Sequence, residues 1–126
     1  MIPYKKFIPG IAWFFLVLIL LCLPGDDLPK AANWMSVIFF DKWVHIGLFS
    51  VLAFLFMMPF CKSNATNNMK WASITKIAFA VSIWGLTTEF IQKYFIPGRS
   101  FDLLDWGADS TGVLAALLVC KKFYFR

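Results

Sequence analysis

Four apolar runs, each long enough to cross a bilayer as a helix, constrain this chain more than any other feature. They cover residues 7–23, 43–60, 74–91 and 103–120. A membrane-spanning helix needs roughly 17–25 apolar residues. With 126 residues, 60% of them hydrophobic, the chain has more apolar side chain than a soluble fold of this size can bury. We therefore predict one all-α domain over residues 1–126, an integral membrane bundle of four transmembrane helices.

The connection between the first and second spans differs from the other two. Pro24, Gly25 and Pro29 predict a loop directly after the first span. Residues 31–40 (AANWMSVIFF) are apolar but too few to cross the membrane. They suit a short interfacial helix, with Trp34 at the level of the headgroups.

Basic residues indicate the orientation of the bundle. The chain carries a net charge of +5, and most of its lysines and arginines lie in short segments beside the apolar runs. Basic residues are retained on the cytoplasmic side of a membrane. Both termini are therefore expected to be cytoplasmic, and membrane lipids rather than nucleic acid are the expected partners. One side holds Lys5, Lys6, Lys62, Lys70, Lys76, Lys121, Lys122 and Arg126, and the other holds Lys30, Lys42, Lys93 and Arg99.

Three groups of ionisable and amide residues lie in or beside the second, third and fourth spans. An ionisable group at the centre of a span costs about 2.5–3.5 kcal/mol, so such groups usually pair with one another or face a polar site. Within each group the spacing is three or four residues, which puts the members on one face of a helix. The groups are Asp41-Lys42-x-x-His45, Glu89-x-x-Gln92, and Arg99-x-x-Asp102-x-x-Asp105-x-x-x-Asp109.

The three groups are expected to meet at one depth. With the predicted orientation, the second and fourth spans enter the membrane from outside, and the third leaves it there. At about 1.5 Å of rise per residue, Asp109 lies roughly 10 Å deeper than Asp102, and His45 roughly 6 Å deeper than Asp41. The sequence therefore predicts one polar pocket in the outer half of the membrane.

Structural roles are also open for these residues. His45 could be a hydrogen-bonded core histidine, and Lys42 an ordinary interfacial charge. Asp102 could cap the fourth helix, because acids suit a helix N-terminus. An internal salt-bridge network of the acids with Arg99 and Lys93 is the main structural alternative.

The ordered set of motifs resembles the VanZ-like family of bacterial membrane proteins. The matching residues are Asp41, Lys42 and His45, then Glu89 and Gln92, then Pro97, Gly98, Arg99, Asp102 and Asp105. Family members commonly have asparagine where this chain has Asp109. The resemblance implies a bacterial cytoplasmic membrane location and a family-level link to resistance against teicoplanin-type glycopeptides. It also suggests action at the outer face, where lipid-linked cell-wall and glycan precursors are exposed.

The leading hypothesis is a protein that binds or modifies a lipid-linked or anionic envelope substrate. If the protein is an enzyme, His45, Glu89 and Asp105 are the candidates for acid–base catalysis. Arg99, Gln92, Lys42 and Asp102 are the candidates for substrate binding, since a guanidinium suits phosphate or carboxylate. Asp41, Asp105 and Asp109 are candidate ligands of a divalent cation. The alternatives are a non-catalytic headgroup- or antibiotic-interacting protein and a structural protein whose charges clamp the helices.

Overall fold

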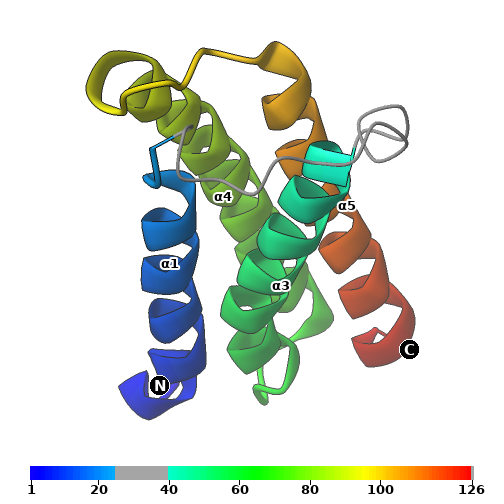
Figure 1. Cartoon of the computed structure of the whole chain (residues 1–126). Helices are drawn as coiled ribbons and strands as arrows, with labels where there is room; N and C mark the ends of the chain where they lie inside the picture. Colours follow the sequence, from blue (N-terminus) through cyan, green and yellow to red (C-terminus); the bar gives the residue numbers. More distant parts are fainter. Residues whose placement is uncertain (25–39, 126) are drawn as a thin grey trace.

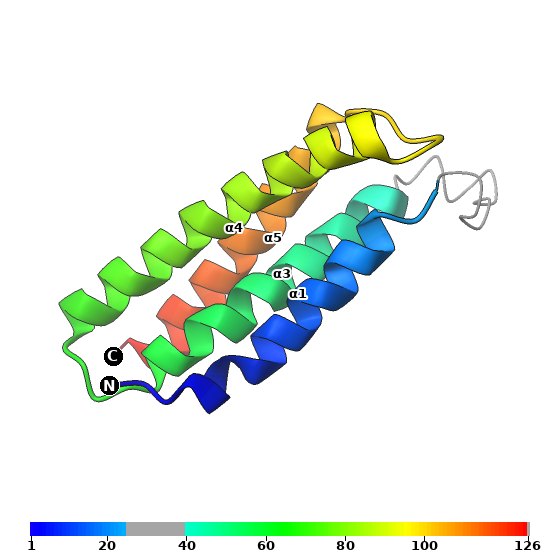
Figure 2. The ribbon, with the colours of Figure 1, turned by 90° about the vertical axis from the view of Figure 1, so that its left-hand side faces the viewer.

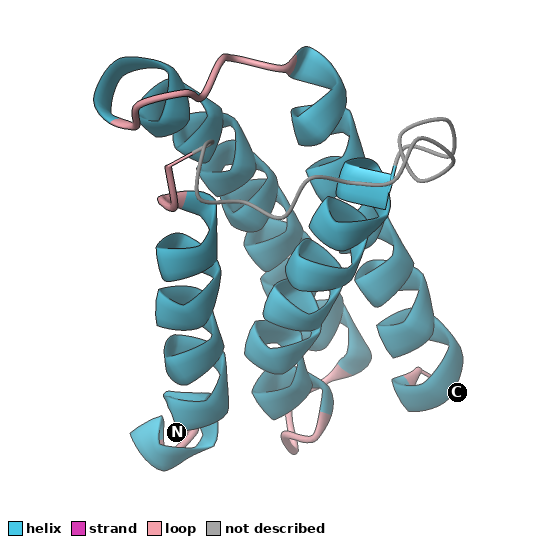
Figure 3. Cartoon of the chain, in the orientation of Figure 1, coloured by secondary structure: helices cyan, strands magenta, loops and turns pink. Residues whose placement is uncertain are grey.

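The protein folds as a bundle of long helices. The computed structural model describes residues 1–24 and 40–125. That part comprises a 3-10 turn, η1 (Tyr4–Phe7), and the helices α1 (Ile8–Leu21), α3 (Phe40–Cys61), α4 (Asn67–Phe95) and α5 (Leu103–Tyr124), with no strand among these residues (Figure 3). Four stretches, η1 with α1 and each of the other helices, are long and apolar enough to cross a membrane. The predicted all-α, four-span fold is confirmed. The expected interfacial helix lies outside the described residues, except that Phe40 begins α3.

Within the described residues, α1, α3, α4 and α5 run alternately in opposite directions (Figures 1 and 2). One end of the bundle holds the N-terminus, the α3–α4 connection and the end of α5, and we call it the terminal end. The other holds the ends of α1 and α4 and the starts of α3 and α5, and we call it the site end. Consequently, the polar groups of α3, α4 and α5 lie near the same end of the bundle.

Helices α3 and α5 pack most closely, and a glycine allows it. A Cβ on Gly112 would lie 2.3 Å from the Ile46 carbonyl oxygen and 2.9 Å from the Ser50 nitrogen. Small residues permit this approach between helices, and in lipid such close packing replaces the hydrophobic effect as a source of stability. The tight α3–α5 contact fixes the spacing of the side chains that face each other across it.

Hydrogen bonds join the remaining helices. The Trp106 indole of α5 donates to the Ser82 carbonyl of α4 at 3.0 Å, and the Ser82 and Ser110 hydroxyls lie 2.8 Å apart. The Trp13 indole of α1 donates to the Leu48 carbonyl of α3 at 3.0 Å. These bonds satisfy polar groups that could not bond to lipid.

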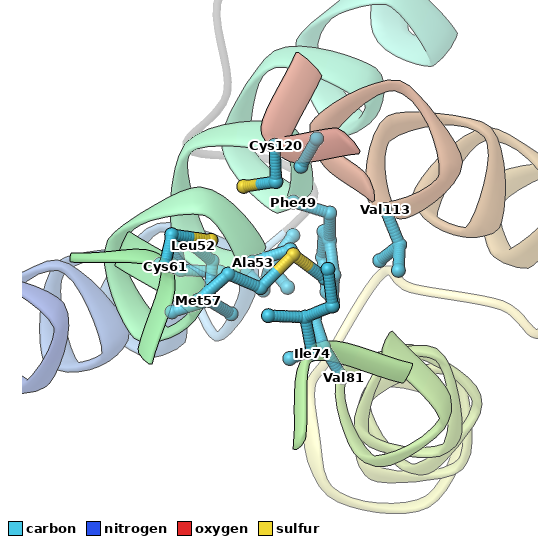
Figure 4. Close-up of a cluster of buried hydrophobic side chains, with 12 residues drawn as sticks. Phe49, Leu52, Ala53, Met57, Cys61, Ile74, Val81, Val113 and Cys120 are labelled. Carbon is cyan, nitrogen blue, oxygen red and sulfur yellow. The ribbon is translucent and has the colours of Figure 1, made fainter. Parts of the chain in front are cut away.

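Apolar side chains fill the interior of the bundle and also cover its outside. Figure 4 shows the buried cluster, in which Phe49, Leu52 and Met57 of α3 pack with Ile74 and side chains of α5. Large apolar side chains are also exposed along the helices, as expected where lipid is the solvent. They include Ile11, Phe15 and Ile19 on α1, Phe79 and Ile83 on α4, and Leu114 and Leu118 on α5.

Two helices begin before the apolar runs that predicted them. Helix α4 begins at Asn67 rather than near residue 74, because the Thr66 side chain caps it by accepting a hydrogen bond from the Met69 amide. Helix α3 begins at Phe40 rather than Trp43. Asp41 and Lys42 are therefore helical, as their spacing from His45 implied.

Candidate functional site

The site begins with one ammonium group surrounded by carboxylates at the site end. Lys42 Nζ lies 2.6 Å from Asp41 Oδ2, 2.7 Å from Asp102 Oδ2 and 2.7 Å from Asp105 Oδ1. Asp41 and Lys42 come from α3, whereas Asp105 is in the first turn of α5 and Asp102 precedes it. Lys42 therefore joins α3 to the start of α5 through two ion pairs, with Asp102 and Asp105, and forms a third with Asp41 within α3. We call these four residues the outer cluster.

The connection between α4 and α5 places Asp102. Gly98 adopts a φ of 73°, and the Arg99 amide donates to the Ile96 carbonyl at 3.3 Å, so Pro97-Gly98 forms the expected turn. Asp102 then caps α5 by accepting a hydrogen bond of 2.9 Å from the Leu104 amide. The hydrogen bond from Lys42 holds the pKa of Asp102 below its ordinary value of 3.8. Asp102 thus serves both as a helix cap and as a partner of Lys42.

A second group lies one turn deeper, beneath the outer cluster. His45 Nδ1 lies 2.7 Å from Asp109 Oδ1, and His45 Nε2 lies 3.7 Å from Asp105 Oδ2. Glu89 of α4 lies beside this pair and accepts a hydrogen bond of 3.0 Å from the Asp102 amide. Glu89 and Asp109 are fully buried and His45 is 6% exposed. We call His45, Glu89 and Asp109 the inner cluster, and Asp105 links it to the outer one.

Two carboxylate oxygens of the inner cluster are not used by the fold. Glu89 Oε1 and Asp109 Oδ2 are buried and have no hydrogen-bond partner among the described residues. Buried polar atoms are almost always paired, so unpaired ones call for an explanation. Across the described site, five carboxylates face the ammonium of Lys42 and the imidazole of His45. The site holds more acid than its own cations neutralise.

Gln92 and Arg99 contact the end of α1. Gln92 Nε2 donates to the Leu21 carbonyl at 2.9 Å, and Arg99 Nη2 lies 3.4 Å from the same oxygen. The last carbonyls of a helix lack intrahelical donors, so these two side chains act as a C-terminal cap for α1. Arg99 Nε is buried and has no partner among the described residues.

The cation of the internal clamp differs from the one that the sequence suggested. In residues 1–24 and 40–125, neither Arg99 nor Lys93 forms an ion pair with a carboxylate. The Lys93 ammonium lies 5.2 Å from the centre of the Tyr94 ring instead. Lys42, interpreted as an interfacial charge or a substrate-binding residue, is the cation that pairs with the acids.

The proposed metal ligands are divided between the two clusters. Among the described residues, Asp41, Asp102 and Asp105 form one group whose oxygens lie within 4.8 Å of one another, and His45, Glu89 and Asp109 form a second. In the first group the Lys42 ammonium already contacts each carboxylate. The predicted trio of Asp41, Asp105 and Asp109 is therefore not one of these groups.

Gly85 lies within the third apolar run, and no motif of the sequence singles it out. A Cβ at this position would lie 2.8 Å from Asp109 Oδ2. Gly85 thus lets α4 approach the inner cluster, and its position one turn before Glu89 is the signal that could have identified it.

Comparisons with protein-family models, with curated proteins and with solved structures find no match to this chain. The resemblance to VanZ-like proteins therefore stays a prediction from its motifs.

Proposed function

We propose that the chain is a VanZ-like protein of the bacterial cytoplasmic membrane that acts at the outer face on a lipid-linked or cell-envelope substrate. The observation that carries the proposal is the inner cluster. A histidine–carboxylate pair, with a second buried carboxylate beside it, lies at the site end of the bundle. Such a pair is suited to proton transfer and is an unusual choice for packing inside a membrane.

The orientation follows from the distribution of charge over the two ends. The terminal end carries Lys5, Lys6, Lys62, Lys70, Lys121 and Lys122. Among the described residues the site end carries Lys42, Lys93 and Arg99, and its acids count little in the positive-inside rule. The positive-inside rule then puts both termini in the cytoplasm and the site at the outer leaflet.

The proposed chemistry assigns one role to each residue of the inner cluster. With Nδ1–H donated to Asp109, His45 Nε2 carries the lone pair that accepts a proton from a substrate hydroxyl. Asp109 orients the ring and stabilises the imidazolium that forms. Asp105 Oδ2, 3.7 Å from His45 Nε2, lies next to the atom that exchanges the proton. Glu89 is the second acid–base group, because its Oε2 is held by the Asp102 amide while its Oε1 has no partner among the described residues.

Anion recognition is assigned to Arg99 rather than to Lys42. Lys42 has three carboxylate partners, so a substrate phosphate would have to displace one of them. Arg99 keeps a buried Nε–H without a partner among the described residues. Its planar guanidinium is suited to a phosphate or carboxylate of the substrate.

The test is a profile of lipids and cell-wall precursors from cells with and without the protein. Wild-type protein is expected to change the profile, and His45→Gln to abolish the change although it accumulates in the membrane. Thr111→Ala, at an exposed position of α5, is the control and should act as wild type. An unchanged profile with wild-type protein contradicts the proposal.

A second candidate, a purely structural clamp, is favoured by the two ion pairs, with Asp102 and Asp105, that join α3 to the start of α5 through Lys42. Failure of His45→Gln to accumulate would support the clamp. If His45→Gln keeps activity and Arg99→Ala loses it, headgroup or antibiotic binding without catalysis is favoured instead.

A further inference from the structure

The terminal end contains a cavity of about 490 Å³, far from the proposed site. Its walls come from the N-terminal segment with η1, from the α3–α4 connection and from the start of α4. Three lysines from these different segments, Lys6, Lys62 and Lys70, line it together with Asn64. Apolar side chains, including Ile2, Phe60 and Met69, complete the lining.

The three lysines bring positive charge that the described protein does not neutralise. In residues 1–24 and 40–125, no carboxylate forms an ion pair with Lys6, Lys62 or Lys70. Every acid in that part of the chain belongs to the two clusters at the site end. An anion entering the cavity would therefore meet ammonium groups on several sides and no opposing carboxylate from the described residues.

The hydroxyl groups of the cavity are already committed to the backbone. Ser63 Oγ donates to the Phe60 carbonyl at 2.7 Å, and Ser73 Oγ donates to the Met69 carbonyl at 2.9 Å. Among the lining side chains, the lysine ammonium groups and the Asn64 amide are therefore the donors left for a ligand. Point charges of this kind suit the oxygens of a phosphate.

A second cavity, of about 230 Å³, adjoins the first. Lys6 and Lys62 line both, and the second is otherwise lined by Pro9 of α1 and by Leu55, Met58 and Pro59 of α3. Its lining is thus basic where it meets the first cavity and apolar along the membrane-spanning helices. An anionic headgroup joined to a hydrocarbon chain has this same arrangement of charge and apolar surface.

We propose that the lysine cavity and the adjoining apolar groove form a binding site for one anionic phospholipid, with its phosphate among Lys6, Lys62 and Lys70. An acyl chain follows the groove between α1 and α3. Basic recesses between transmembrane helices recognise anionic headgroups in this way. Given the proposed orientation, the lipid belongs to the inner leaflet. This lipid site does not depend on any activity of the inner cluster.

The experiment is a titration of the purified full chain in detergent with phosphatidylglycerol and with phosphatidylcholine, read by native mass spectrometry. Each basic residue near an anionic lipid contributes about 1 kcal/mol, or about fivefold in affinity. The variant Lys6→Gln/Lys62→Gln/Lys70→Gln should therefore lose roughly 100-fold in affinity for phosphatidylglycerol. The matched control, Lys5→Gln/Lys121→Gln/Lys122→Gln, removes the same charge from the same end outside the cavity and should bind as wild type.

Three results would overturn the proposal. One is equal affinity of the wild type for the two lipids, and another is an equal loss in the cavity variant and its control. The third is competition by inorganic phosphate or glycerophosphoglycerol as strong as by the whole lipid, since a soluble anion then fills the cavity without the groove. Circular dichroism checks that the triple variant is folded. If it is not, Lys62→Glu, at an exposed position, replaces it and should lose affinity at least about tenfold.

Discussion

His45 Nδ1 and Asp109 Oδ1 lie 2.7 Å apart and join α3 to α5 inside the bundle, where Asp109 is fully buried. The second oxygen of the same carboxylate has no partner among the described residues. One oxygen of Asp109 therefore supports the histidine, while the other is a buried acceptor that the fold does not use. This combination makes Asp109 the residue at which stability and function can be separated.

Asp109→Asn is expected to keep the fold. Asparagine keeps an Oδ1 acceptor for a protonated Nδ1 of His45, but its amide nitrogen takes the place of Oδ2, which has no partner among the described residues, so the free energy of unfolding should fall by about 1 kcal/mol. Asp109→Ala loses the hydrogen bond and leaves a buried donor unpaired, which should cost about 2 kcal/mol. Equilibrium unfolding in mixed micelles measures both. Equal destabilisation by the two substitutions would show that the charge itself holds the helices.

Lys42→Met is expected to destabilise the protein more than either change at Asp109. Without the ammonium, the carboxylates of Asp41, Asp102 and Asp105 repel one another. Breaking a buried ion pair costs 3–5 kcal/mol, and we expect about 3 kcal/mol here because Asp41 is exposed. The same unfolding assay measures this loss.

The control for Lys42→Met is the variant Lys42→Met/Asp102→Asn/Asp105→Asn, which removes two of the three charges that face the missing ammonium. Its stability should return most of the way to that of the wild type. A triple variant no more stable than Lys42→Met would mean that the aliphatic part of Lys42, rather than its charge, supports the fold.

Gln92→Ala should affect stability and leave function intact. The amide of Gln92 is buried and donates to the Leu21 carbonyl, so its removal leaves that acceptor short of one donor and costs about 1 kcal/mol. The unfolding transition and the precursor profile are measured on the same preparation. If the profile is lost while the transition is unchanged, Gln92 contacts substrate, as its position in the motif had suggested.

The sequence was sufficient for the helices and for the meeting of the three polar groups at one end of the bundle, because both depend on local spacing. Hydropathy identified the four spans, and the i+4 separation of Asp41 and His45 put them on the face of α3 that meets α5. The partners of Gln92 and Arg99 depend instead on where a neighbouring helix ends. Gln92 and Arg99 are capping residues only because α1 stops at Leu21 beside them, and no pattern within their own segments contains that information.

The cation that pairs with the acids of the site could not be predicted from the sequence either. Lys42, Lys93 and Arg99 are all near the site end, and spacing alone did not decide which cation pairs with the acids. The helical twist turns Lys42 toward α5, where it meets Asp102 and Asp105. Lys93, one residue beyond Gln92 on α4, lies instead over the ring of Tyr94. The pairing follows from the crossing of α3 and α5, which is a property of the folded chain.

The close crossing of α3 and α5 can be tested by substituting Gly112, which lies at the contact. In Gly112→Ala the new methyl group would meet the backbone of Ile46 and Ser50, which cannot move aside without separating α3 from α5. We expect a loss of about 3 kcal/mol in the free energy of unfolding, the upper end for overpacking. Gly107→Ala, on the same helix with no atom within 4 Å of the new Cβ, is the control. It should be neutral or stabilising by up to about 1 kcal/mol, because alanine favours helix. Equal effects at the two positions would contradict the close α3–α5 contact.

Acid should weaken the outer cluster through Asp102. Lys42 lowers the pKa of Asp102 below its ordinary value of 3.8, so the ionised form is the one that the folded state favours. This contribution to stability is present above pH 3.8 and is lost as the pH falls from there through the lower pKa of the folded state. The variant Asp102→Asn should keep the cap to the Leu104 amide but lack this titration. Its unfolding temperature should therefore fall less steeply than that of the wild type below about pH 4. Parallel curves for the two proteins in that range would place the acid sensitivity in the other carboxylates and remove Lys42 as the cause of the lowered pKa.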